Sequence, residues 1–209
     1  MAFSSYDAAS HAVGRSTALL EGARSSELPS TVRADMRRLS LVMAVAALDT
    51  YMHRLVVERG FAHDELPNAL ADLTVPFGRL VAQADETRSA ARRPAHNSRP
   101  RVGVKRQLRN RLLRETFQRF DDIARGLGMI DRSGRWSAIA AQMGGVIDTN
   151  DLRRQLNTIV DRRNQIVHEG DYLRLDRPQS SKRNAMTSRE ARQAIEFVAR
   201  FIDSIHAAI

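Results

Sequence analysis

The sequence predicts an all-α fold, a bundle of about six to seven helices. Apolar residues recur at helical spacing in several long segments, and no segment shows the alternation of a half-buried strand. Glycine, proline and capping residues separate these segments. Because 209 residues suit one domain, we expect a single domain over 1–209, with a basic loop or insertion at about 88–104.

The first two helices are predicted from apolar patterning. One is expected from about Ser5 to Arg24, with a loosely apolar side. The next is the most apolar segment of the chain, from Thr31 to Arg59, with Ser30 as its candidate N-cap. Its centre, 41–48, is apolar nearly all round, which is typical of a buried central helix, and Gly60 ends it.

Two polar residues interrupt this central helix. Asp49 and His53 are one turn apart and therefore lie on one face. One interpretation is an internal salt bridge or a hydrogen bond to a neighbouring helix. The other is that Asp49 projects into a site and orients an arginine or histidine.

The middle of the chain is strongly basic. Residues 64–90 predict one or two short helices, broken near Pro67 and Pro76. The stretch 88–114 then contains ten cationic side chains and no acidic one. From about Lys105 onward the apolar residues recur at helical spacing, so the cations there occupy the solvated face. This helix is expected to continue to Gly126 and to include Leu108, Leu112, Leu113, Phe117 and Phe120 in its apolar stripe. The run is either a solvated surface or a surface that binds an RNA backbone.

Three further helices complete the bundle. A short one begins at Trp136 and ends near Met143. The residues 149–151 offer an N-cap for the next. A capping box, Thr187-Ser-Arg-Glu190, opens the last helix. The buried stripe of that helix is Ala191, Ala194, Ile195, Val198, Phe201, Ile202 and Ile205.

Composition limits the function classes. The chain has no cysteine, which excludes disulfides, thiolate metal sites and cysteine nucleophiles. Its net charge of +9 favours polyanionic partners. We expect a cytoplasmic protein without a membrane segment, because no apolar run approaches the length that spans a bilayer and no signal sequence is recognisable.

A dense polar cluster ends the helix that begins near Asp151. On this helix Arg163 falls near the middle of the apolar face, so it needs an anionic partner or a wet cleft. The apolar residues of that face are Leu152, Leu156, Ile159, Val160, Ile166 and Val167. Asn164 and His168 lie one turn apart at its edge. Arg163 and His168 diverge by roughly 140° on an ideal helix. Either the final turn deforms, or a second copy of the helix supplies the other half of a site.

The residue types suit RNA cleavage. A histidine can move a proton to or from the ribose 2′-oxygen or the leaving 5′-oxygen, while an arginine binds the phosphate. No metal or other cofactor is required. The competing interpretation is structural: Arg163 pairs with Asp49 or Asp161, Asn164 caps a helix, and His168 binds a backbone carbonyl.

The string Arg163-Asn-Gln-Ile-Val-His168 resembles the signature of HEPN domains, an arginine followed by four to six residues and a histidine. The continuation Glu-Gly-Asp171 and the stretch 47–51 are similar to the RiboL-PSP type of that superfamily. The resemblance is best over about 105–205 and 35–58.

This resemblance implies an all-α bundle that dimerises and brings two motifs into one cleft. It implies a metal-independent endoribonuclease with a toxin, anti-phage or RNA-processing role, possible control by an antitoxin or defence partner, and no cofactor. Arg163 and His168 would be catalytic, supported by Asn164 and assisted by Asp49. The expected contacts to RNA are Arg162, Lys105, Arg106 and Arg109. The alternative is a non-catalytic module for RNA binding or protein assembly.

Overall fold

The computed structural model describes residues 3–62, 67–74, 100–144, 148–173 and 182–209, together with 78, 81–82, 84–85 and 88–89. Over these residues it contains eight α-helices, one 3-10 turn and no named strand. An isolated antiparallel bridge joins Tyr172 to Arg183. The all-α prediction is confirmed. The helix count slightly exceeds the expected range because one predicted helix is divided in two.

The elements in chain order are α1 Ser5–Gly22, α2 Ser30–Arg59, α3 Asn68–Ala71, α5 Pro100–Leu112, α6 Phe120–Gly128, η1 Ser133–Arg135, α7 Trp136–Gln142, α8 Thr149–Glu169 and α9 Ser188–Ala208. Much of the predicted basic loop at 88–104 lies outside the described residues, as does the expected break at Pro76.

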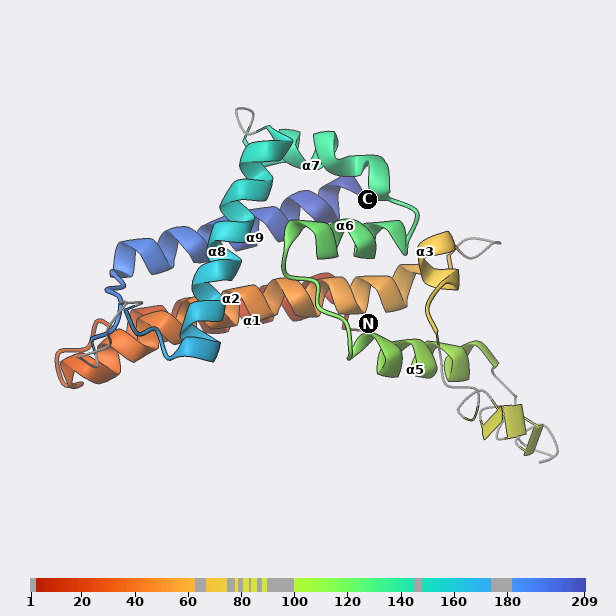
Figure 1. The fold of residues 1–209 in the computed structure, drawn as a ribbon, viewed down its shortest axis with the longest axis horizontal. Coiled ribbons are helices and arrows are strands. Elements are labelled where there is room, and N and C mark those ends of the chain that lie inside the picture. The colour runs from red at the N-terminus through yellow and green to blue at the C-terminus, as the bar shows by residue number, and fades with distance from the viewer. Residues whose placement is uncertain are drawn as a thin grey trace.

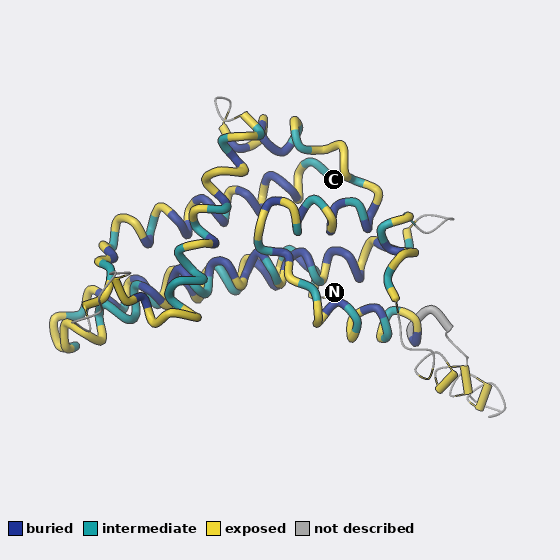
Figure 2. Tube along the Cα trace, in the orientation of Figure 1, coloured by how far each residue is buried: buried dark blue, intermediate teal, exposed yellow. Residues whose placement is uncertain are grey.

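Helix α2 is the centre of the bundle. Helices α1 and α9 pack along it, and α8 crosses both α2 and α9 at a steep angle (Figure 1). The buried residues concentrate where these helices face one another (Figure 2). Ala44, Val45, Ala47 and Leu48 of α2 are fully buried, as its apolar centre predicts.

By length and composition, α2 is apolar enough to cross a membrane, which corrects the expectation that no run approaches that length. However, 61% of its most apolar window is buried inside the bundle. The apolar character of α2 is therefore that of a core helix.

The predicted helix from Lys105 to Gly126 is wrong in its middle. Helix α5 ends at Leu112 and α6 begins at Phe120, and Leu113, expected in the buried stripe, is 75% exposed. The intervening backbone is bound by side chains of other helices. The Asp49 carboxylate accepts a hydrogen bond from the Phe117 N–H at 2.7 Å, and Asn157 Oδ1 accepts one from the Phe120 N–H at 3.1 Å.

The helix starts were predicted with mixed success. Ser30 is the first residue of α2 and makes no capping bond, since Pro29 occupies the N-cap. The cap of α8 is Asp148, whose side chain accepts from the Asp151 N–H at 2.7 Å, so the expected cap at 149–151 is wrong by one residue. The capping box of Thr187 and Glu190 is confirmed.

Candidate functional site

The candidate site lies on the last turns of α8. Leu152, Leu156 and Val160 bury one side of this helix in the core. The helix ends at Gly170, whose φ of +62° is left-handed and whose N–H donates to the Gln165 carbonyl. Such a glycine is a common helix C-cap, because the left-handed conformation costs glycine little.

Arg163 is partly buried and has no carboxylate partner among the described residues. Its Nη1 donates to Asn164 Oδ1 at 3.0 Å, and its Nε is buried without a hydrogen bond. The guanidinium is therefore oriented by a neutral amide, and no carboxylate of the described residues neutralises its charge. This combination leaves hydrogen-bonding capacity for an anionic ligand.

His168 lies on the exposed side of the last turn of α8. It forms no hydrogen bond or ion pair within the described part of the chain. The helix stays α-helical through Glu169, so its final turn does not deform to bring His168 round to Arg163. The angular separation of the two side chains remains that of a regular helix.

The carboxylates that a purely structural interpretation assigned to Arg163 are bound elsewhere. Asp161 forms an ion pair with Arg119. The contacts of Asp49 are with the Phe117 N–H at 2.7 Å, Gln118 Nε2 at 3.3 Å and His53 Nδ1 at 3.4 Å.

Asp49 and His53 together hold the turn between α5 and α6. The ring nitrogens of His53 contact two carbonyl oxygens, those of Asp49 and Leu112, both at 2.8 Å. These contacts of Asp49 favour the structural interpretation over an assisting role, and the assisting role stays a prediction.

Arg162 also has a structural partner. Its Nη1 and Nη2 donate to the two carboxylate oxygens of Asp171, the second at 2.9 Å. Asp171 is fully buried and also accepts from Arg38 Nε at 2.6 Å and from Asn184 Nδ2 at 3.2 Å. The guanidinium of Arg162 is thus bound to the protein, which gives it a structural role, and the expected contact with RNA stays a prediction.

Asp171 is a structural residue that the sequence pattern did not single out. The signal for its role was an acidic residue placed directly after the C-cap glycine of the motif helix. Its buried position shows that the end of α8 is anchored to α2 and to the segment before α9 by one carboxylate.

The cations of α5 are at the opposite end of the bundle from the end of α8 (Figure 1). Lys105 is half-buried, whereas Arg106 and Arg109 are exposed. Arg109 makes no ion pair with the described residues, in contrast to Arg111, which pairs with Glu115 at 2.5 Å. The structure therefore does not bring these cations next to Arg163.

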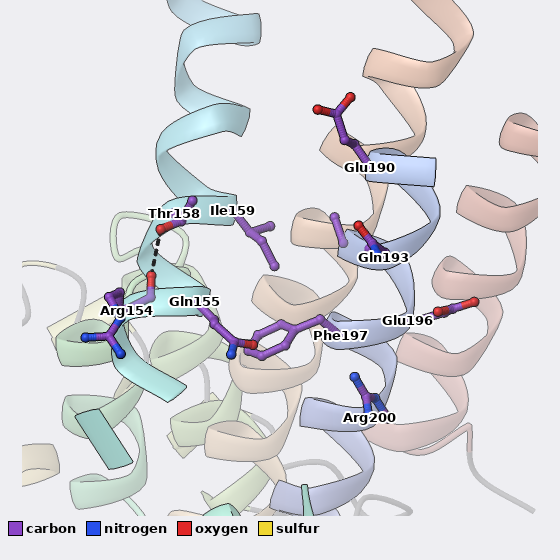
Figure 3. A pocket seen from close by; sticks show the side chains of 10 residues that line it. Arg154, Gln155, Thr158, Ile159, Glu190, Gln193, Glu196, Phe197 and Arg200 are labelled. Atoms are coloured by element: carbon purple, nitrogen blue, oxygen red, sulfur yellow. Dashed lines mark hydrogen bonds between the residues drawn. The ribbon is translucent and has the colours of Figure 1, made fainter. Parts of the chain in front are cut away.

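A groove of about 610 Å³ lies between α8 and α9 (Figure 3). Ile159 and Phe197 contribute apolar lining, and Gln155 extends toward Phe197 across it (Figure 3). No residue of the motif lines this groove, which is on the α9 side of α8. Separately, no three His, Asp or Glu side chains gather as a metal site within the described ranges.

The comparisons with known proteins identify the family. The model of the RiboL-PSP-HEPN family matches residues 17–209, which is most of the chain and includes α8 and its motif. No curated protein and no solved structure matches. The all-α bundle, with Arg163, Asn164 and His168 on the last turns of a core-packed helix, agrees with that match, and the chain belongs to the RiboL-PSP-HEPN family.

Proposed function

We propose that the protein is a metal-independent endoribonuclease whose active site is completed by two copies of the chain. The observation that carries this proposal is the state of Arg163, a partly buried guanidinium that is oriented by Asn164 and has no anionic partner among the described residues. A buried cation without a counter-ion is costly unless it binds an anionic ligand. A phosphate of RNA is the ligand that we propose.

The geometry of α8 supports a composite site. Since the helix is regular through Glu169, Arg163 and His168 of one protomer face different directions. In our proposal Arg163 of one protomer works with His168 of the other across a two-fold axis.

Exposed apolar side chains beside the motif support the dimer. Val167 belongs to the apolar stripe of α8 but is 46% exposed, and Leu39 of α2 is 50% exposed. The two helices are tied together there, because Arg38 and Arg162 share the Asp171 carboxylate. We propose that this face, with the exposed Ala46 of α2, contacts the second copy.

The proposed reaction is an internal transfer at phosphorus. His168 accepts the proton of the ribose 2′-hydroxyl, the 2′-oxygen–phosphorus bond forms, and the phosphorus–5′-oxygen bond breaks. The leaving oxygen takes a proton from the imidazolium so formed or from water. Arg163 stabilises the negative charge that develops on the phosphate oxygens. The products are a 2′,3′-cyclic phosphate and a 5′-hydroxyl.

We further propose that Lys105, Arg106 and Arg109 of α5 bind the backbone of the same RNA at a distance from the cut. Each cation that contacts a phosphate releases a bound counterion from the RNA. Replacing one of these residues should therefore reduce the slope of log affinity against log salt concentration by about one. The proposed setting is a cytoplasmic toxin, anti-phage or RNA-processing role, with an antitoxin or defence partner as a possible control.

The test is cleavage of an end-labelled single-stranded RNA in EDTA. Arg163→Ala and His168→Ala should each abolish cleavage while the fold is retained. Arg154→Ala, an exposed arginine of the same helix, and His11→Ala, an exposed histidine of α1, are the matched controls and should cut at the parental rate.

Two outcomes would contradict the proposal. If both motif variants cut at the parental rate, the catalytic assignment is wrong. If the parental protein binds RNA in a salt-dependent way that survives His168→Ala but turns none over, the chain is a non-catalytic RNA-binding module.

A further inference from the structure

An exposed aromatic side chain stands beside the motif, and neither the core nor the proposed reaction uses it. Tyr172 follows His168 by four residues and is 46% exposed. Gly170 and Asp171 both have a φ of +62°, so the chain reverses direction directly after α8. This reversal brings the Tyr172 ring back onto the helix end. A Cβ added at Gly170 would lie only 2.9 Å from Tyr172 Cε2.

The backbone of Tyr172 is fixed on both sides. Tyr172 pairs with Arg183 in the isolated bridge, and the Leu173 N–H donates to the Lys182 carbonyl at 3.0 Å. Before it, the buried carboxylate of Asp171 anchors the preceding residue. Because the backbone is already fixed, the ring loses little conformational entropy when a ligand binds to it.

The surroundings of the ring leave nearly half of the residue exposed. The guanidinium carbon of Arg183 lies 5.7 Å from the ring centroid, and Arg183 Nη1 is itself held by Asp35 Oδ1 at 2.6 Å. On the Gly170 side, an added Cβ would lie 2.9 Å from Cε2 and 3.2 Å from Cδ2 of the ring. With Arg183 over the ring and Gly170 close to its Cε2 and Cδ2 atoms, Tyr172 still keeps 46% of its surface exposed.

We propose that Tyr172 stacks on an unpaired base of the RNA, one that neighbours the phosphate bound by Arg163. This inference rests on the proposed function and names its substrate class, single-stranded RNA. A flat aromatic face beside cations is the arrangement by which proteins bind unpaired bases, since every base offers a π-face. A base within a duplex is already stacked and cannot offer its face.

Binding is measured in the His168→Ala background so that the RNA stays intact. The probe is a single-stranded RNA oligonucleotide that carries 2-aminopurine at successive positions. Tyr172→Ala should raise the Kd by roughly tenfold and remove the fluorescence quenching at one position of the probe. Tyr172→Phe should keep both, because it retains the ring. Leu173→Ala, the exposed apolar neighbour, is the matched control and should bind with parental affinity.

Duplex RNA of the same sequence should bind equally well to the protein with and without Tyr172→Ala. The inference is overturned if Tyr172→Ala leaves the affinity and the quenching unchanged, or if Tyr172→Phe loses as much as Tyr172→Ala. It is also overturned if Tyr172→Ala dissociates the dimer, which would make Tyr172 an interface residue.

The failures of the two proposals are distinguishable. If the parental protein cuts RNA and only the stacking result is negative, the base-stacking role alone is wrong. If the parental protein neither binds nor cuts RNA, the proposed function is wrong and this inference fails with it.

Discussion

Arg162 and Asp171 form a bidentate ion pair at the end of α8. The two Nη atoms of Arg162 donate to the two oxygens of the fully buried Asp171 carboxylate. Arg38 of α2 donates to the same carboxylate at 2.6 Å. One acidic side chain thus joins the motif helix, the central helix and the segment before α9. Asp171 follows His168 by three residues, so this anchor lies directly after the motif.

Removing the carboxylate charge should destabilise the protein strongly. Asp171→Asn leaves Arg38 and Arg162 without their anion, and breaking a buried ion pair in this way costs about 3–5 kcal/mol. The matched control is Asp161→Asn on the same helix, whose pair with Arg119 is exposed and should contribute about 0–1 kcal/mol. Urea unfolding of both variants measures the difference. Equal losses would show that burial of the Arg162 pair is not what stabilises this end of α8.

Asp49 should matter for stability and not for turnover. Asp49→Ala removes the acceptor of the Phe117 N–H, which should cost about 1–3 kcal/mol of unfolding free energy. Glu58→Ala, an exposed carboxylate of the same helix, should stay within about 0.5 kcal/mol of the parent. The rate of RNA cleavage per folded molecule should be unchanged in both. A lower rate of RNA cleavage per folded molecule in Asp49→Ala, but not in Glu58→Ala, would support a catalytic role for Asp49.

The capping box of α9 predicts a dependence of stability on pH. The backbone and side-chain hydrogen bonds from Thr187 hold the pKa of Glu190 below its ordinary value. Because the pKa of Glu190 is lower in the folded state, its ionised carboxylate stabilises the fold at a pH above the unfolded-state pKa. This stabilisation is lost as the pH falls through the folded-state pKa. Thr187→Ala should therefore cost about 1 kcal/mol at neutral pH and less in acid. Urea unfolding at pH 7 and at low pH checks this, and a cost that grows in acid would have the wrong sign.

The proposed contact with a second copy predicts a selective effect of charge. Leu39→Glu should convert the dimer to a monomer and abolish RNA cleavage together. Leu113→Glu places the same charge at an even more exposed leucine far from the motif and should leave the dimer intact. Analytical ultracentrifugation measures the mass of each variant. A dimer that survives Leu39→Glu with parental affinity would place the interface elsewhere.

The sequence predicted the elements whose apolar stripes meet the core, and it failed where contacts between distant residues decide the structure. The apolar centre of α2 and the apolar stripe of α9 were sufficient evidence, because the side chains of each that face the interior of the bundle are buried. The break between α5 and α6 was missed. Leu113, Phe117 and Phe120 keep helical spacing, but Asp49, 68 residues before Phe117, binds the backbone there.

The site shows the same division. Arg163, Asn164 and His168 could be proposed as a site because they lie on one helix and match a family pattern, and their catalytic role stays a prediction. The role of Asp171 could not be read from the sequence, since its partner Arg38 is 133 residues away. The ion pair between Arg162 and Asp171 was also missed, because nothing in the sequence shows that the partner of a charged helix residue lies inside the protein.

The measurement that tests the composite site most directly is complementation between two inactive variants. Arg163→Ala and His168→Ala proteins are mixed after dissociation so that subunits exchange, and native mass spectrometry confirms the mixed dimers. If one protomer supplies the arginine and its partner the histidine, each variant alone is inactive. The mixture should then recover at most about a quarter of the parental cleavage rate. A mixture that contains folded mixed dimers and still cuts no RNA would contradict an active site shared between two copies.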